Sequence, residues 1–118
     1  MLGDLIMSGL DVSDFSYLSK LQENARTEFE EFDAFHSAAQ RSDGLIPSKY
    51  RELIALAVAL TTQCPLCIEN HSVRAKQAGA SKEEISETVF VGAAVRAGGT
   101  VAHGLLALRS FEKGQALT

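Results

Sequence analysis

Both cysteines of the chain lie in one Cys-Pro-Leu-Cys segment, as Cys64 and Cys67, and His71 follows four residues after the second cysteine. On a helix these residues stand at positions i, i+3 and i+7, so they share one face. Two thiols one turn apart can approach disulfide distance, and an imidazole one turn further along can take a proton from a thiol. The spacing therefore predicts dithiol redox chemistry.

Two features of this segment favour different cysteines as the reactive one. Cys64 stands at the expected start of a helix, where unpaired N–H groups and the helix dipole favour a thiolate. Cys67 stands one turn inside the helix, where His71 can act as its general base or, as imidazolium, stabilise its thiolate. The competing interpretation is a pair of structural cysteines in a core, since free cysteine is commonly buried.

A carboxylate completes the set of candidate residues. Glu52 lies twelve residues before Cys64, near the start of an otherwise apolar helical segment. If that segment packs antiparallel to the helix that begins at Cys64, Glu52 can face Cys67 and His71 and accept a proton from the imidazole. The alternative is a solvated first-turn glutamate that complements the helix dipole.

The overall composition limits the class of protein. The chain has 118 residues, 46% hydrophobic and 22% charged, as expected for one globular domain. A net charge of −4 and the absence of a Lys/Arg cluster argue against general nucleic-acid binding. No apolar run reaches the roughly 18–20 residues of a membrane span, and Met1-Leu2-Gly3-Asp4 lacks the basic region of a signal peptide. We therefore expect no membrane association and a reducing, cytoplasmic location.

The segments that must position the candidate residues follow a helical pattern, since no stretch shows strand alternation. A phenylalanine-rich stripe at spacings of three and four predicts a first helix from about Asp14 to Gln40, with an acidic opposite face. Pro47 and Ser48 start a second helix that reaches Thr62. This helix is apolar nearly all round from Leu53 to Leu60, which predicts the buried centre of the fold.

Three further helices follow in the sequence. The third opens at Cys64-Pro65 and closes at Gly79. Ser81 and Glu84 match a capping box that starts the fourth at about Lys82. Gly98-Gly99 predicts a break before a fifth helix. The sequence therefore predicts an all-α fold, one bundle of about five to six helices.

Three segments together resemble the AhpD-like / carboxymuconolactone decarboxylase superfamily. They are Arg51-Glu52-Leu53-Ile54-Ala55-Leu56-Ala57, Cys64-Pro65-Leu66-Cys67-Ile68-Glu69-Asn70-His71 and Ala75-Lys76-Gln77-Ala78-Gly79-Ala80. The likeness extends over roughly Leu45 to Leu108. It implies one AhpD-like domain over residues 1–118, with 1–44 as an N-terminal assembly helix and 45–113 as the CxxC-bearing core. It also implies homo-oligomers, commonly trimers or hexamers.

The peroxidase branch of this superfamily implies a role for each candidate residue. The second cysteine attacks a hydroperoxide, the first resolves it as a disulfide, and the glutamate and histidine relay protons. Carried over, Cys67 is peroxidatic, Cys64 is resolving, and Glu52 and His71 form the relay; we favour Cys67 because an adjacent base acts on it directly. The alkylhydroperoxidase D proteins carry a further histidine where this chain has Leu66, and they hold two copies of the helical core.

The sequence thus predicts a thiol-dependent peroxidase or disulfide oxidoreductase that uses no cofactor or metal. Its partners are a small hydroperoxide and an external dithiol or protein reductant. Three alternatives stay open: a decarboxylase-like enzyme, a non-catalytic oligomeric protein, and a zinc protein with Cys64, Cys67, His71 and Glu52 as ligands. We interpret His103 as a hydrogen-bonded packing residue, His36 as a helix C-terminal charge, and Tyr50 as packing with its hydroxyl at an edge.

Overall fold

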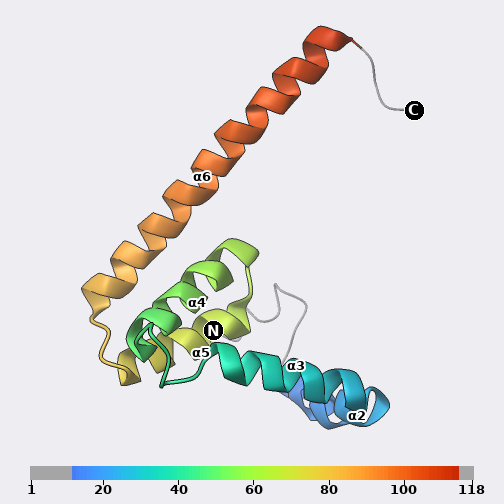
Figure 1. The fold of residues 1–118 in the computed structure, drawn as a ribbon, viewed down its shortest axis with the longest axis vertical. Helices are drawn as coiled ribbons and strands as arrows, with labels where there is room; N and C mark the ends of the chain where they lie inside the picture. Colours follow the sequence, from blue (N-terminus) through green and yellow to red (C-terminus); the bar gives the residue numbers. More distant parts are fainter. Residues whose placement is uncertain (1–11, 115–118) are drawn as a thin grey trace.

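The computed structural model describes residues 12–114, which are helical with no strand in that range (Figure 1). Five α-helices follow one 3₁₀ helix. Their bounds are η1 Val12–Tyr17, α2 Leu18–Asn24, α3 Arg26–Ala39, α4 Ser48–Thr62, α5 Pro65–Gln77 and α6 Lys82–Lys113. The prediction of an all-α fold is confirmed.

Helices α4 and α5 form an antiparallel pair at the centre of the fold. Gln63, which ends α4, takes the left-handed conformation with φ 57° and ψ 51°, so the chain reverses within two residues. Cys64 then caps the start of α5 in an extended conformation, and Pro65 occupies the first helical position, which suits its missing N–H. The backbone N–H of Cys64 still donates to the carbonyl of Ala59 at 3.1 Å, so the link stays tight. The predicted bounds of these two helices are confirmed.

The core between these helices is small. Its buried apolar side chains among the described residues are Leu56, Ala59 and Ala75. Ile54 and Val58 on α4 remain about half exposed, at 53% and 56%. The prediction that α4 is buried from Leu53 to Leu60 therefore holds for one face of the helix and is wrong for the others.

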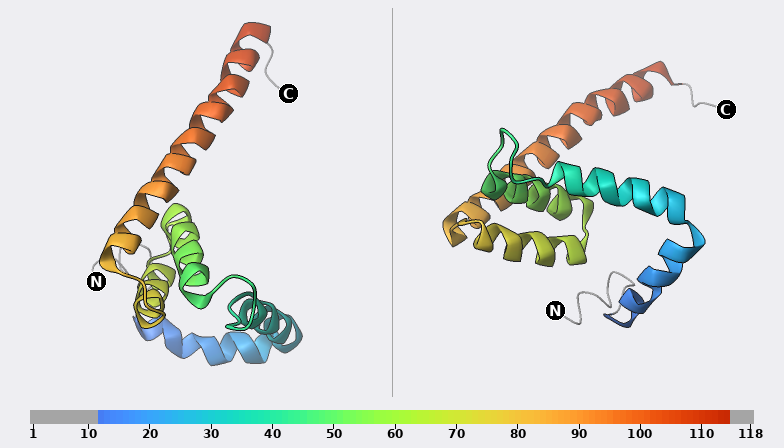
Figure 2. Two further views of the ribbon diagram at one scale, coloured as in Figure 1. Left: turned by 60° about the vertical axis from the view of Figure 1, so that its left-hand side comes forward. Right: turned by 60° about the horizontal axis from the view of Figure 1, so that its bottom comes forward.

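Helix α6 begins with the predicted capping box. Ser81 Oγ accepts a hydrogen bond from the N–H of Glu84 at 3.0 Å, and the N–H of Ser81 donates to Glu84 Oε1 at 3.0 Å. The first part of α6 packs on α4, and the C-terminal half extends away from the other helices (Figures 1 and 2). The predicted break at Gly98-Gly99 is wrong, because each glycine costs only about 1 kcal/mol in a helix interior and the good helix formers Arg96 and Ala97 precede the pair.

The N-terminal arm, η1 with α2 and α3, replaces the single helix predicted from Asp14 to Gln40. The chain bends at Ala25, where φ is −140° and ψ is 58°. Asn24 is a weak helix former, and no residue of α2 or α3 is buried, so packing does not enforce a continuous helix. Arg51 ties the arm to α4, since its guanidinium donates to the carbonyls of Ala39 at 2.7 Å and Ile46 at 2.9 Å.

One expectation about apolar stretches is corrected. Helix α6 contains an 18-residue window that is long and apolar enough to cross a membrane by composition alone. Core helices of soluble proteins pass the same test, so the finding does not establish a span. The N-terminal residues that predicted no signal peptide lie outside the described part of the chain.

Candidate functional site

The two cysteines form a disulfide at the start of α5. Cys64 and Cys67 are bonded to each other, with their Cα atoms 5.3 Å apart. Cys64 is the N-cap residue and Cys67 lies within the first turn of α5. The turn that reverses the chain after α4 therefore also brings the two sulfur atoms together.

Glu52 of α4 and His71 of α5 form a buried pair between the two helices. Glu52 Oε2 lies 2.7 Å from His71 Nδ1, and the two residues are only 6% and 8% exposed. The contact joins the second turn of α4 to the middle of α5, nineteen positions apart, as the antiparallel packing requires. Glu52 is thus an interior residue, and the alternative of a solvated first-turn glutamate is wrong.

The guanidinium of Arg74 contacts the other oxygen of the same carboxylate. Arg74 Nε lies 3.2 Å from Glu52 Oε1, and Arg74 stands one turn after His71 on α5. Both carboxylate oxygens therefore have a partner, which satisfies the rule that buried charges are paired. An ionised carboxylate can only accept, so the contact orients His71 with Nδ1 toward Glu52 and leaves Nε2 as the ring nitrogen not engaged by the carboxylate. The sequence analysis did not identify Arg74 as a site residue, although its spacing of three from His71 places it on the same helix face.

The disulfide, through Cys67, and the imidazole of His71 both line one groove. Cys67 and His71 line a cavity of about 430 Å³, which we call the site groove, between α3, α4 and α5. Its walls are mostly apolar, with Ile46, Ile54 and Val58 among them. A molecule in the site groove can therefore meet the sulfur of Cys67 and the imidazole of His71 while its body contacts aliphatic side chains.

Helix α3 contributes two residues, His36 and Gln40, that the sequence analysis did not assign to the site. His36 and Gln40 line the site groove, and Gln40 Nε2 lies 2.8 Å from His36 Nε2. His36 stands in the last turn of α3, as predicted for a charge at a helix end. Its place in the groove depends on how the N-terminal arm folds back toward α4, which a local pattern does not reveal.

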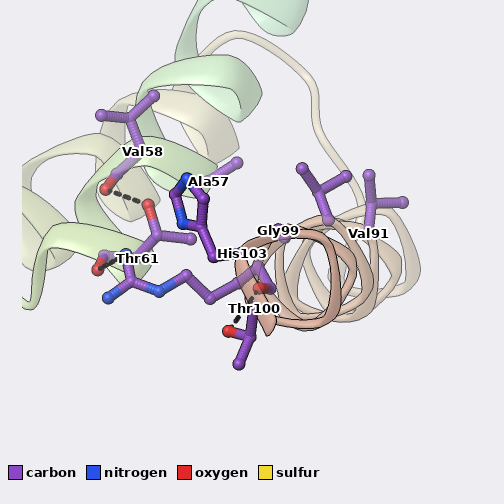
Figure 3. A pocket seen from close by; sticks show the side chains of 10 residues that line it. Ala57, Val58, Thr61, Val91, Gly99, Thr100 and His103 are labelled. Atoms are coloured by element: carbon purple, nitrogen blue, oxygen red, sulfur yellow. Dashed lines mark hydrogen bonds between the residues drawn. The ribbon is translucent and has the colours of Figure 1, made fainter. Parts of the chain in front are cut away.

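Two other residues lie away from the site. His103 is exposed on α6 and lines a separate groove against α4, so the prediction of a packed histidine is wrong (Figure 3). Tyr50 is 48% exposed, with the Lys49 ammonium 5.0 Å from its ring centre.

Within residues 12–114 no group of three or more His, Cys, Asp or Glu side chains is placed to hold a metal ion, so the zinc alternative gains no support.

The comparisons with known proteins fit this geometry. Residues 28–110 match the carboxymuconolactone decarboxylase family. The chain belongs to the carboxymuconolactone decarboxylase family. The matched range runs from α3 into α6 and includes every candidate site residue, so the predicted resemblance is confirmed.

Two known proteins are similar to the chain, one in structure and one in sequence. The structure resembles the apo crystal structure of a carboxymuconolactone decarboxylase family protein from Legionella pneumophila, with a TM-score of 0.63 and 31% identity over 84% of this chain and 88% of that one. The sequence is 43% identical over 72 residues to a Paracoccus denitrificans protein described as uncharacterized protein 4 in the cox locus. That match covers 61% of this chain and 65% of the relative, which is less than two thirds of its length.

Proposed function

We propose that the chain is a thiol-dependent peroxidase or disulfide oxidoreductase that works through the Cys64–Cys67 couple. The observation that carries the proposal is that Cys67 of the disulfide and His71 line the same groove, while buried Glu52 contacts His71 Nδ1. A dithiol needs a base to form its thiolate at neutral pH, and a base needs a partner that fixes its orientation. In this chain His71 on α5 can serve as the base, and Glu52 on the adjacent helix α4 is its orienting partner.

The peroxide step begins from the reduced dithiol. His71 Nε2 takes the proton of the Cys67 thiol, and the carboxylate of Glu52 stabilises the resulting imidazolium. The Cys67 thiolate attacks the distal oxygen of the hydroperoxide, the O–O bond breaks, and the leaving alkoxide takes the proton from His71. Cys67 becomes a sulfenic acid and the hydroperoxide is reduced to an alcohol.

The second half of the cycle regenerates the dithiol. The sulfur of Cys64 attacks the sulfenic acid of Cys67, which forms the disulfide and releases water. An external dithiol, free or on a protein, then reduces this disulfide by exchange and becomes a disulfide itself. The site groove is mostly aliphatic, so it suits a hydroperoxide with an apolar body. A cytoplasmic location and a trimeric or hexameric assembly complete the proposal.

Thiol counting with intact-mass spectrometry tests the proposal. We expect the reduced protein to lose two thiols and two hydrogens per chain after one equivalent of an organic hydroperoxide, and a dithiol should reverse the change. Cys67→Ser should consume no peroxide, whereas Cys64→Ser should stop at a sulfenic acid that a cyclic dione traps. Peroxide consumption by Cys67→Ser at the wild-type rate would disprove the scheme.

The family match supports a decarboxylase as the second candidate. A lactone decarboxylation needs no change in the oxidation state of sulfur, so it separates cleanly from the first proposal. A Cys64→Ser/Cys67→Ser double variant that decarboxylates a carboxylated lactone as fast as the wild type would favour this second candidate.

A further inference from the structure

The proposed cycle gives no role to Arg74, although this residue contacts the carboxylate on which the proton relay depends. Arg74 Nε lies 3.2 Å from Glu52 Oε1, while Glu52 Oε2 lies 2.7 Å from His71 Nδ1. The two contacts use different oxygens, so the carboxylate bridges a guanidinium and an imidazole that stand one turn apart on α5. Arg74 is therefore placed to act on the relay from the side opposite to the imidazole.

Arg74 lies outside the cavity in which the proposed reaction takes place. Among the described residues, those that line the site groove include Cys67 and His71 but neither Glu52 nor Arg74. A hydroperoxide in the groove can therefore meet the imidazole directly, whereas the guanidinium is connected to the imidazole through the carboxylate. An effect of Arg74 on the Cys67 thiol has to act through Glu52 and His71.

The Glu52 side chain needs more than one contact to hold its carboxylate in one orientation. The terminal torsion of a glutamate, which sets the plane of the carboxylate, has a broad energy profile. A contact with His71 alone leaves that plane free to rotate and lets either oxygen face the imidazole. The ion pair between Arg74 and Oε1 opposes this rotation, because the rotation would move Oε1 away from the guanidinium. With both contacts in place, Oε2 is the oxygen that faces His71 Nδ1.

Burial makes the contact more specific than an ordinary surface ion pair. The side chain of Glu52 is 7% exposed and that of Arg74 is 42% exposed. Water competes strongly with an ion pair when both partners are exposed, but here the carboxylate is buried and water has little access to it. Arg74 also has a fixed base, since its carbonyl accepts from the N–H of Ala78 at 2.9 Å and its neighbour Ala75 is fully buried.

A purely structural role for Arg74 is the competing explanation. Arg74 and Lys76 both stand in the last turn of α5, where a positive charge complements the helix dipole. Such a role depends on the charge at the end of the helix and is independent of Glu52. Lys76 is exposed in the same turn, so it provides a matched control for the loss of that charge.

We propose that Arg74 is a positioning residue of the proton relay: its guanidinium fixes the Glu52 carboxylate, and this carboxylate in turn orients the imidazole of His71. The proposal rests on the proposed function, since it concerns the step in which His71 takes the proton of the Cys67 thiol. That step needs no further reactant. The proton moves from sulfur to Nε2, and the guanidinium keeps all of its own protons.

The alkylation rate of Cys67 tests the proposal without any peroxide. In the Cys64→Ser chain Cys67 is the single thiol, and intact-mass spectrometry follows its reaction with iodoacetamide near neutral pH. Only the thiolate reacts, so the rate reports how well the relay takes the thiol proton. Arg74→Met should lower this rate about tenfold, less than the roughly hundredfold cost that a misplaced group can reach, because water replaces part of the exposed guanidinium. Lys76→Met should leave the rate unchanged.

Two further comparisons separate a positioning role from a structural one. A lysine ammonium stands one bond further from the backbone than Arg74 Nε, so it can reach the same oxygen, and Arg74→Lys should keep the rate within about threefold of the parent chain. In a Glu52→Gln background, Arg74→Met should cause no further loss, because Arg74 acts through the carboxylate. A helix-dipole or packing role would instead give independent losses that add.

The possible failures of this proposal and of the proposed function are distinguishable. A normal rate for Arg74→Met beside a slow Glu52→Gln would overturn the role of Arg74 and leave the relay intact. Normal rates for both variants would overturn the relay and the role of Arg74 together. Additive losses, or an Arg74→Lys rate as low as that of Arg74→Met, would show a structural role. Circular dichroism checks that each variant folds, and Arg74→Gln replaces Arg74→Met in every comparison if the methionine variant does not.

Discussion

Replacing Glu52 with glutamine tests the central contact of the site while it preserves the side-chain shape. Glu52 accepts from His71 Nδ1 at 2.7 Å and lies 3.2 Å from Arg74 Nε. A glutamine amide has one acceptor oxygen, so it can serve only one of these donors, and its NH₂ group faces the other. The change therefore leaves a polar mismatch at a position that is 6% exposed.

The expected cost in folding stability follows from the more buried contact. The side chain of Arg74 is 42% exposed, so water can hydrate its guanidinium and the loss on that side is small. The His71 contact is buried on both sides, and a hydrogen bond to a charged group in such a place contributes about 1.5–3 kcal/mol. We expect Glu52→Gln to lower the free energy of unfolding by about that amount, measured by urea denaturation of the oxidised protein.

The expected cost in activity is larger. Without the carboxylate, His71 loses the group that fixes its Nδ1 proton and stabilises its imidazolium, so Nε2 becomes a poor base for Cys67. General base catalysis contributes about 10²–10⁴-fold, and we expect the rate of peroxide-dependent thiol loss in stopped-flow assays to fall about 100-fold or more. Glu69→Gln is the matched control, because it removes the same charge from an exposed position on α5. A Glu52→Gln protein within about 0.5 kcal/mol and threefold of that control would refute the reasoning.

Three further predictions concern the elements that carry the site. Leu56 is 1% exposed, so Leu56→Ala should cost about 2–5 kcal/mol in urea denaturation, whereas Leu45→Ala at a fully exposed position should cost less than about 0.5 kcal/mol. Ser81→Ala removes the cap of α6 and should cost about 1 kcal/mol by the same measurement. The backbone N–H of Ser81 and then the Lys49 ammonium lower the pKa of Glu84 from its ordinary value of 4.5; this stabilisation is present above pH 4.5 and is lost as the pH falls through the lowered pKa. The difference in urea midpoint between wild type and Glu84→Gln should therefore shrink as the pH falls from 6 to below 4, and a constant difference would contradict it.

The parts of the fold that the sequence predicted well are those that local chemistry determines. Pro65 and the apolar segment before it predict the reversal between α4 and α5. The capping box of Ser81 and Glu84 predicts the start of α6. The approach of Glu52 to His71 followed from the short link between two helices, because a two-residue connection leaves only antiparallel packing.

The parts that the sequence did not predict depend on packing or on its absence. Gly98 and Gly99 continue a helix because the surrounding residues offset their cost, so composition alone misplaced a break there. The first predicted helix bends at Ala25 because no residue of α2 or α3 is buried, so packing does not enforce one continuous helix. The presence of His36 in the site groove results from the return of the arm toward α4, a contact that Arg51 fixes through backbone carbonyls rather than through a readable side-chain pair.

The placement of Glu52 depends on α4, a helix that is only partly buried. Val58 of α4 lines both the site groove and the separate groove against α6. The same helix carries Glu52, and it packs on the small core of Leu56, Ala59 and Ala75. A core of this size stabilises a helix weakly, so the contacts of the Glu52 carboxylate with α5 contribute a larger share of its positioning. Catalysis by a positioned carboxylate requires such positioning. The simultaneous contacts of Glu52 with His71 and Arg74 are therefore a physical means of fixing the carboxylate that orients His71.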